Sequence, residues 1–392
     1  MRIKDVNSWI VHIPYKTPIK WALGIHKGTT RTIVQIDTDE GITGIGETIG
    51  AFPKIIIDGN IKRIIIGEDP LNVKKLWWKC LWSSPWAGIN TPYNLSAAAI
   101  EMACWDILGK TVDKPIYALF GGAVRDRVKY AGYVFPPSYL NEEDAPEKMA
   151  KISQDLIKNY GFDTLEIKMG IYPPPVEIEI IRAIREYVGN DVDLRVDING
   201  VWSLETAIKM LKTLKEFNIT NVEDPVNGVQ SMSYLKKVID LPFSTHCTNV
   251  SIIASLNAAD AVVGDIHDSG IFGGGIIPLM KLINTCELIG IDFWLHDSNE
   301  LGISKAATLH IAASTPYMIH PNQNMRIYLE DDIIKTKDSL NCKNGCINIP
   351  DKPGLGVELD FAKLEQYAKI YEAIAKEGMD VYFSESLSCP RW

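Results

Sequence analysis

Three rhythms of hydrophobic and polar positions follow one another along the chain. Residues 1–60 alternate apolar and polar side chains in short runs such as WIVHI and TRTIVQIDT, and DEG at 39–41 is a turn signal between two of them. Such alternation is typical of half-buried strands. Residues 61–125 show helical periodicity, most clearly in NLSAAAIEMACWDILGK, where Asn94 or Ser96 is the expected cap. We therefore expect an antiparallel sheet followed by helices.

From about residue 128, short apolar strands alternate with helical segments. The expected strand ends are GFDTLEIKMG, DLRVDING, ITNVEDPV, LPFSTHCTN, AVVGDIHDSG, IDFWLHDSNE and, less clearly, YMIHPNQN. They fall about 20–30 residues apart, the usual length of a strand–helix unit. No glycine-rich phosphate fingerprint follows the first strand, which disfavours a dinucleotide-binding fold. Roughly seven such units favour an α/β barrel of the TIM type.

Composition and charge narrow the function classes. The 392 residues are 46% hydrophobic and 23% charged, which is ordinary for a soluble enzyme. A net charge of −9 disfavours a broad nucleic-acid surface, because that binding depends on Lys and Arg neutralising phosphates. No apolar run approaches the ~18 residues of a membrane helix, and MRIKDVNSWIVHIPYK lacks a signal-peptide core. Seven scattered cysteines fit a reducing cytoplasm, so we expect a cytoplasmic protein without nucleic-acid or membrane partners.

Ionisable and amide side chains stand at the C-terminal ends of the expected strands. Reading those ends in order gives Lys168, Asp197 with Asn199, Glu223 with Asp224, His246 with Asn249, Asp265 with His267, and His296. In a barrel these ends open into one mouth, where active sites are built. Each residue alone has a structural explanation: a turn at Asp197, a helix start at Asp224, a surface lysine or a buried histidine. Their combination favours chemistry.

The two carboxylates on neighbouring strand ends, Asp197 and Glu223, suit a hard divalent cation with positions left for water and substrate. Oxygen ligands of this kind indicate Mg²⁺. Lys168 lies one strand earlier, and a nearby cation and partial burial both lower the pKa of a lysine toward that of a working base. On the far side, Asp265 is expected to orient the His296 imidazole as an acid–base pair.

The order Lys, Asp, Glu, third ligand, Asp, His resembles the enolase superfamily, in its mandelate racemase and muconate lactonizing branch, and more narrowly the glucarate dehydratase-like enzymes. The matching stretches are YGFDTLEIKMG, VDINGVWSLETAIK, VEDP, the GDIH segment, FWLH, PDKPGLGVELD, AIEMACWDILGK and GITGIGETIG. The resemblance implies an α/β fold in three regions. An α+β capping domain (1–125) precedes a (β/α)7–8 TIM-like barrel (126–345), and a C-terminal tail (346–392) completes the cap.

The resemblance also implies roles for individual residues. Members bind Mg²⁺ and abstract the proton α to a carboxylate through a metal-stabilised enediolate. Carried over residue by residue, Lys168 is a base and His296 with Asp265 is the opposing acid–base dyad. Asp197 and Glu223 hold the metal. The expected substrate contacts are His26, Thr91, Tyr133, Glu166, Asn199, Asn249, Asn299 and Asn322.

Two positions depart from the family pattern. The family usually carries Lys-x-Lys on the second barrel strand, and here Glu166 replaces the first lysine, so the pocket for the substrate carboxylate is expected to be rebuilt. The third metal ligand of the dehydratases is an asparagine, and here that position is His246, with Asn249 just beyond as the alternative. We prefer His246 by position. Because imidazole binds Mg²⁺ less readily than oxygen does, Mn²⁺ also stays open.

The leading hypothesis is a Mg²⁺-dependent dehydratase of a sugar acid, aldonate or aldarate, that gives a 2-keto-3-deoxy product. Lys168 or His296 removes the α-proton, and His296 protonates the leaving β-hydroxyl. A racemase or epimerase of a 2-hydroxy acid would use the same two bases, and a non-catalytic binding member is the third hypothesis. Loss of a positive contact at Glu166 favours a mono-acid over a diacid. Family members are commonly assemblies, so we expect a homo-oligomer.

Overall fold

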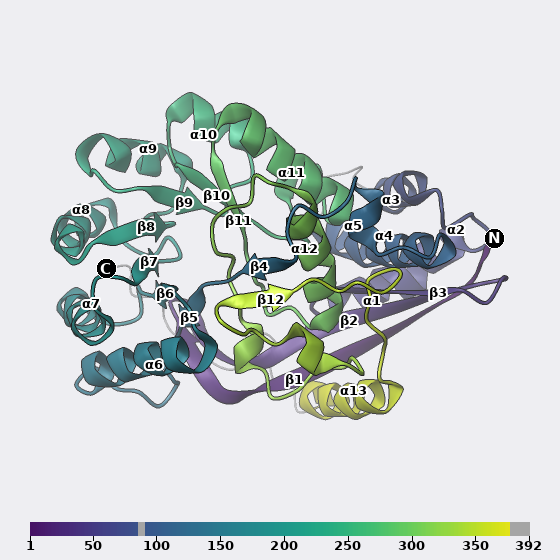
Figure 1. Ribbon diagram of the computed structural model, residues 1–392, viewed down its shortest axis with the longest axis horizontal. Coiled ribbons are helices and arrows are strands. Elements are labelled where there is room, and N and C mark those ends of the chain that lie inside the picture. Colours follow the sequence, from purple (N-terminus) through teal and green to yellow (C-terminus); the bar gives the residue numbers. More distant parts are fainter. Residues whose placement is uncertain (85–90, 377–392) are drawn as a thin grey trace.

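The computed structural model describes residues 1–84 and 91–376. An antiparallel sheet and a layer of helices come first, a parallel sheet curled into a barrel follows, and the last described helix returns to the first sheet (Figure 1). The α/β class, with a barrel and an N-terminal α+β cap, is therefore confirmed.

The N-terminal sheet has three strands in chain order: β1 (Ile3–Trp21), β2 (Gly24–Thr38) and β3 (Thr43–Ile49). They pair in antiparallel fashion, as their alternating pattern predicts. The long β1–β2 hairpin has a register shift between Pro14 and Ile19 and turns at Ala22 and Leu23. Ile19 also forms a bridge with Pro137, so the end of the hairpin lies against the barrel.

The helices of the cap lie next to this sheet. They are α1 (Phe52–Ile56), a π-helical turn (Ile57–Ile61), α2 (Lys62–Ile65), α3 (Val73–Trp82), α4 (Thr91–Thr111) and α5 (Ile116–Leu119). Helix α4 approaches β3 closely because the strand offers glycine there: a Cβ at Gly46 would lie 1.9 Å from the Ala99 carbonyl oxygen. The expected cap at Asn94 or Ser96 is wrong, since α4 already includes Thr91 and both residues lie inside it.

Seven parallel strands form the barrel sheet, in chain order from one edge to the other. They are β5 (Gly132–Val134), β6 (Thr164–Lys168), β7 (Asp193–Asp197), β8 (Ile219–Glu223), β9 (Phe243–Thr245), β10 (Ala261–Gly264) and β11 (Asp292–Leu295). The accompanying helices are α6 (Ala145–Tyr160), α7 (Pro174–Val188), α8 (Leu204–Leu214), α9 (Val229–Val238), α10 (Val250–Leu256), α11 (Ile276–Ile289) and α12 (Gly302–Ser314). Short 3₁₀ turns cover Lys215–Phe217, Gly270–Phe272, Arg326–Tyr328 and Lys337–Leu340.

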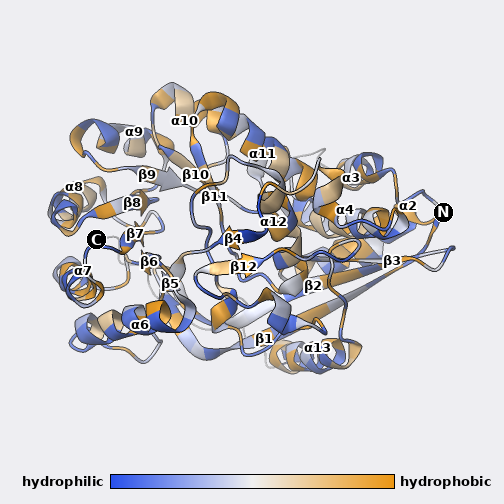
Figure 2. Ribbon diagram, viewed as in Figure 1, coloured by the Kyte–Doolittle hydropathy of each residue, from blue (hydrophilic) through white to orange (hydrophobic). Residues whose placement is uncertain are grey.

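The helices cover the outside of the curled sheet (Figure 1). Most of them bury one face, whereas α12 is buried from Gly302 to Ala313. In α6, for example, Met149, Ala150, Ser153 and Leu156 are buried on one side. The hydropathy colouring shows the same division, with hydrophobic residues on the strands and polar residues prominent on the outer helices (Figure 2). This amphipathic pattern is the one from which the sequence predicted these helices.

The segment YMIHPNQN is not a strand, although the sequence predicted one there. It nevertheless closes the barrel between the edge strands β5 and β11. The Asn322 side chain accepts a hydrogen bond from Leu295 N–H (2.8 Å), and Gln323 N–H donates to the Leu295 carbonyl (3.0 Å). On the other side, Ala131 N–H donates to the Asn322 carbonyl (2.8 Å). The missing strand is thus replaced by a short run of backbone and side-chain hydrogen bonds.

Two buried carboxylates of the cap domain lie at the N-termini of barrel helices. Glu47 of β3 accepts hydrogen bonds from Leu301 N–H (2.8 Å) and Ser304 N–H (2.9 Å) at the start of α12. Glu101 of α4 accepts them from Ile276 N–H (2.7 Å) and Ile277 N–H (2.9 Å) at the start of α11. A helix N-terminus exposes unpaired N–H groups and favours negative charge, so these contacts join the two domains.

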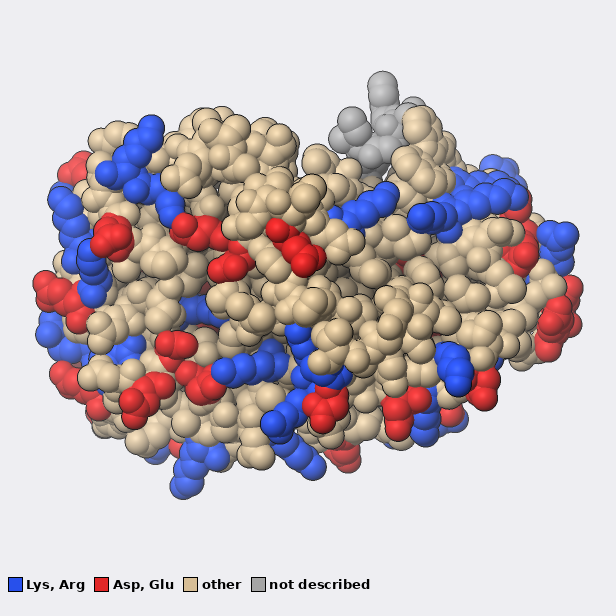
Figure 3. Space-filling model, turned by 45° about the horizontal axis from the view of Figure 1, so that its top comes forward, with Lys and Arg blue, Asp and Glu red and all other residues tan. Residues whose placement is uncertain are grey.

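The last described helix, α13 (Phe361–Lys376), packs on β1, where the Phe361 ring meets the Trp9 ring edge-on at 6.4 Å between centroids. Before it, β12 (Cys346–Asn348) pairs with β4 (Arg127–Lys129). The predicted tail beyond residue 376 lies outside the described residues, and the domain boundaries stay predictions. Within residues 1–84 and 91–376, no helix is long and apolar enough to cross a membrane. On the face in Figure 3, basic and acidic side chains are intermingled.

Candidate active site and metal centre

Three neighbouring strand ends bring the predicted ligands together. Lys168, Asp197 and Glu223 are the last residues of β6, β7 and β8, and the register pairs Lys168 with Asp197 and Asp197 with Glu223. His246 follows the end of β9 directly. Because the strands are parallel and in register, these side chains meet at the same mouth of the barrel. The ligand atoms of Asp197, Glu223 and His246 lie within 4.8 Å of one another.

The chemistry of these three residues fits a divalent cation. Asp197 is fully buried and Glu223 is 1% exposed, and burial together with the nearby Asp197 charge raises the pKa of Glu223. The His246 Nε2 atom lies 2.7 Å from Glu223 Oε1. Burial lowers the pKa of His246, but Glu223 outweighs it and the pKa rises to about 10. The two carboxylates therefore attract positive charge. A Mg²⁺ or Mn²⁺ ion bound between them would also supply positive charge.

Lys168 is held between a carboxylate and a wall of aromatic rings. Its Nζ donates to Asp197 Oδ2 and to Asn199 Oδ1 (3.1 Å), and the side chain is almost fully buried. The rings of Tyr133 and Phe135 lie 5.0 and 5.6 Å from Nζ. The Tyr133 hydroxyl also donates to Asp197 Oδ2 (3.1 Å). This packing gives the amine one fixed position at the barrel mouth.

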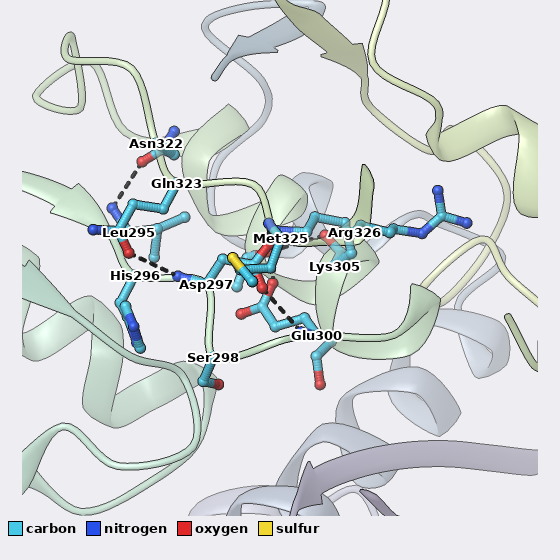
Figure 4. Close-up of polar contacts among 12 residues, drawn as sticks. Leu295, His296, Asp297, Ser298, Glu300, Lys305, Asn322, Gln323, Met325 and Arg326 are labelled. Carbon is cyan, nitrogen blue, oxygen red and sulfur yellow. Dashed lines mark hydrogen bonds and ion pairs between the residues drawn. The ribbon is translucent and has the colours of Figure 1, made fainter. Parts of the chain in front are cut away.

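The predicted acid–base dyad is present across the barrel mouth. His296 Nδ1 lies 3.1 Å from Asp265 Oδ2. Burial raises the pKa of Asp265, but its hydrogen bond to His296 and the nearby His267 outweigh burial and hold the pKa well below its ordinary value. Burial and the neighbouring His246 lower the pKa of His296, while Asp265 opposes them. Figure 4 shows His296 pointing away from the buried Asp297, Glu300 and Lys305.

A cavity of about 300 Å³ joins these groups. Both Lys168 and His296 line it, and so does His246. The rings of His246 and His296 meet edge-on, with 4.5 Å between their centroids. The cap domain supplies one wall, with Ile19, Trp21 and His26 from the β1–β2 hairpin. The arrangement can therefore place two proton-transfer groups and a cation around one small molecule.

Four of the eight expected substrate contacts line this cavity: His26, Tyr133, Asn199 and Asn299. The other four do not. Thr91 is exposed at the start of α4, and the Asn249 side chain caps α10 by accepting a hydrogen bond from Ile252 N–H (3.3 Å). Asn322 closes the barrel. The structure therefore brings His246 to the carboxylates and leaves Asn249 at a helix end.

Glu166 lies inside the barrel and does not reach the cavity. It is 1% exposed, and burial together with the charge of Glu223 raises its pKa to about 8. Its Oε1 accepts a hydrogen bond from Gln323 Nε2 (2.6 Å), which also donates to Glu223 Oε2 (3.0 Å). The Gln323 Oε1 atom accepts from Asp297 N–H (3.3 Å). All of these contacts are internal, and Gln323 links Glu166 to the candidate metal ligand Glu223.

Sequence reasoning missed Gln323 and most of the aromatic wall. Gln323 was quoted only inside an expected strand, and nothing in its neighbours distinguishes it from a loop amide. Trp21 and Phe135 come from the cap hairpin and the segment after β5, and their role depends on how the cap meets the barrel. The position of Gln323 at the seventh expected strand end, in YMIHPNQN, was the one usable signal.

Comparisons with known proteins cover nearly the whole chain. A family model described as enolase C-terminal domain-like matches residues 148–363, and one described as mandelate racemase/muconate lactonizing enzyme, N-terminal domain, matches residues 5–121. A probable glucarate dehydratase of Streptomyces coelicolor is 28% identical over 92% of this chain and 91% of its own. An N-succinyl-L-Arg/Lys racemase of Bacillus cereus is 27% identical over 93% of this chain and 98% of its own.

A solved structure shows the same fold. It is an enolase from Thermobispora bispora, complexed with magnesium and formate, and it superposes with a TM-score of 0.85 at 28% identity. The match covers 95% of this chain and 93% of that one. The relatives thus include both a dehydratase and a racemase at nearly equal identity.

Proposed function

The chain belongs to the mandelate racemase and muconate lactonizing branch of the enolase superfamily, and from this premise we propose that it is a Mg²⁺-dependent dehydratase of a sugar acid. One observation carries the proposal. Lys168 and His296 line a single cavity together with His246, which clusters with Asp197 and Glu223, and Asp265 holds the His296 ring. Elimination of water needs a base for the α-proton and an acid for the β-hydroxyl, and this cavity offers both.

Asp197, Glu223 and His246 are the residues that would hold the cation. A bound divalent cation supplies a Lewis acid, which stabilises the negative charge that develops on the substrate carboxylate. The magnesium of the Thermobispora bispora neighbour supports this assignment. When Asp197 serves as a ligand, its negative charge is no longer available to Lys168 alone.

The proton balance of the reaction follows from the two flanking groups. Lys168 Nζ or His296 Nε2 takes the proton from the α-carbon, and the electron pair moves toward the carboxylate. His296 Nε2 gives a proton to the β-hydroxyl, which leaves as water while the C–O bond breaks. Asp265 holds Nδ1 of the same ring, which turns Nε2 toward the substrate. The resulting enol takes up a proton at the β-carbon and becomes the 2-keto-3-deoxy acid.

A racemase or epimerase is the second candidate, and a specific observation favours it. Much of the cavity wall is apolar or aromatic, with Ile19, Trp21, Phe135 and Met325. Such a wall also suits a substrate less polar than a sugar acid. The racemase from Bacillus cereus is nearly as similar as the dehydratase. Here Lys168 and His296 would act in turn, one removing the α-proton and the other returning it to the opposite face.

The test is a turnover screen of aldonates and aldarates with Mg²⁺, scored for 2-keto-3-deoxy product. Lys168→Ala and His296→Asn are run beside the wild type. Lys20→Ala and His320→Asn serve as matched controls, because neither residue lines the cavity. Product formation that survives in the controls and disappears in the first two variants supports the dehydratase. Exchange of the α-proton without elimination would indicate the epimerase, and no exchange at all would contradict both.

A further inference from the structure

A second hollow adjoins the catalytic cavity on the side of the metal ligands. It is a groove of about 740 Å³, and Trp21, Asn199 and His246 line both spaces. Its remaining walls come from the loops after β7 and β8, the end of β9 with Cys247 beyond it, the first turn of α9 and Leu23 of the hairpin turn. The two spaces are therefore neighbours that share these three side chains.

Most of the side chains that line the groove are uncharged, the exceptions being Asp224 and His246. Its apolar floor includes the buried side chains of Val201, Val226 and Met232, and the amides of Asn227 and Gln230 lie at its exposed rim. Among the described residues that line it, none is a lysine or an arginine. Its single carboxylate belongs to Asp224, which accepts hydrogen bonds from the Thr245 hydroxyl (2.6 Å) and His246 N–H (3.3 Å).

The catalytic cavity is nearly as poor in lysine and arginine. Lys168 is the one lysine or arginine among the described residues that line it, and its Nζ already contacts Asp197 and Asn199. At position 166, where the family usually has a second lysine, the side chain is a carboxylate bound to Gln323. A carboxylate removed from water without a cationic partner is strongly disfavoured. The two neighbouring spaces thus offer a cationic partner to one substrate carboxylate, the one that would bind the metal.

We propose that the substrate is a monocarboxylic sugar acid, an aldonate, whose uncharged distal chain lies in this groove. The inference rests on the proposed dehydratase function and narrows its substrate class. The apolar floor contacts the C–H faces of the chain, and the amides of Asn227 and Gln230 receive its hydroxyls. An aldarate has a second carboxylate at the distal end, which would enter the groove without a partner.

The test compares each aldonate with the aldarate of the same configuration, because the two differ only at the distal carbon. We expect kcat/KM to be at least about tenfold higher for the aldonate. Asn227→Lys places a cation at the rim and should shift this ratio toward the aldarate by about tenfold. Gln154→Lys, on the exposed side of α6, adds the same charge far from the groove and should leave the ratio unchanged.

The outcomes separate this inference from the function on which it rests. Equal or better turnover of the aldarates would overturn the inference while leaving the dehydratase in place. Absence of turnover for every sugar acid would strike the proposed function instead. Calorimetric titration of the Lys168→Ala protein with the same pairs, in Mg²⁺, then tests the groove without turnover. Tighter binding of the aldarates would overturn the inference there as well.

Discussion

Glu166 and Gln323 show how one residue pair can support a metal ligand from inside a barrel. The side-chain amide of Gln323 donates hydrogen bonds to two carboxylates, those of Glu166 and Glu223. Glu223 Oε2 is thereby fixed, and Oε1 is left on the side of His246. Groups that orient metal ligands in this way affect metal affinity almost as strongly as the ligands do.

We therefore predict that Gln323→Leu weakens binding of Mg²⁺ and Mn²⁺ by about tenfold or more, because Glu223 loses its fixed orientation. Calorimetric titration of the metal-free protein measures this directly. Ser244→Ala is the matched control, since it removes a buried hydrogen bond (2.6 Å to Asn221 Oδ1) from the same part of the sheet. Unchanged metal affinity in Gln323→Leu would show that the amide has no positioning role.

The choice between His246 and Asn249 yields a second prediction at this scale. His246→Ala should abolish tight metal binding, because its imidazole lies among the carboxylates. Asn249→Ala should leave metal affinity nearly unchanged and cost about 1 kcal/mol of stability through loss of the α10 cap. Metal titration and thermal unfolding of both variants check the pair. Loss of metal binding in Asn249→Ala would reverse the ligand assignment.

At the scale of elements, the domains are joined by carboxylates at helix N-termini. Glu101 lies on α4 of the cap, yet its carboxylate oxygens accept hydrogen bonds from N–H groups in the first turn of α11 in the barrel. Its Oε1 also accepts from the Trp105 indole (3.0 Å). Burial raises the pKa of Glu101 to about 7, against an ordinary value of 4.5, even though these hydrogen bonds lower it.

This pKa predicts a pH dependence of stability. Between about pH 4.5 and 7 the folded protein keeps a proton that the unfolded chain releases, so the contribution of Glu101 to stability falls as pH rises. Glu101→Gln mimics the protonated form at every pH. The free energy of unfolding of the variant, relative to that of the wild type, should rise by on the order of 3 kcal/mol between pH 4 and pH 8. Thermal unfolding across this range measures the difference.

The control for this prediction is Glu147→Gln, on the exposed side of α6. It should follow the wild type at every pH, because the exchange leaves Glu101 and its hydrogen bonds in place. A stability difference between the wild type and Glu101→Gln that does not change with pH would show that Glu101 titrates normally.

The elements themselves were largely predictable from the sequence, and the exceptions have physical causes. Strands β6 to β11 were found because apolar runs end in polar residues at regular spacing. Strand β5 was missed because only Gly132–Val134 pair, a stretch too short to show alternation. The predicted strand near Asn322 failed for a different reason. Its closing contacts use a side-chain amide and loop backbone, and these depend on the two neighbouring strands being in place.

For the whole molecule, the site depends on the meeting of cap and barrel. The meeting of six side chains at the barrel mouth could be predicted, because each stands at a strand end and the ends of parallel strands lie at one mouth. These residues are Lys168, Asp197, Glu223, His246, Asp265 and His296. The wall formed by Trp21 and Phe135 could not, since hairpin and loop residues reach the cavity only after the domains dock. The same docking produces the groove beside the metal ligands, which no local pattern indicates.

The central claim is that Lys168 and His296 act on one substrate carbon from either side of the metal cluster. The most direct measurement is NMR of an aldonate incubated with the enzyme and Mg²⁺ in deuterated water, for the wild type, Lys168→Ala and His296→Asn. We expect a 2-keto-3-deoxy product from the wild type, and a loss of about a hundredfold or more in rate for each variant. Unimpaired product formation in either variant would contradict it.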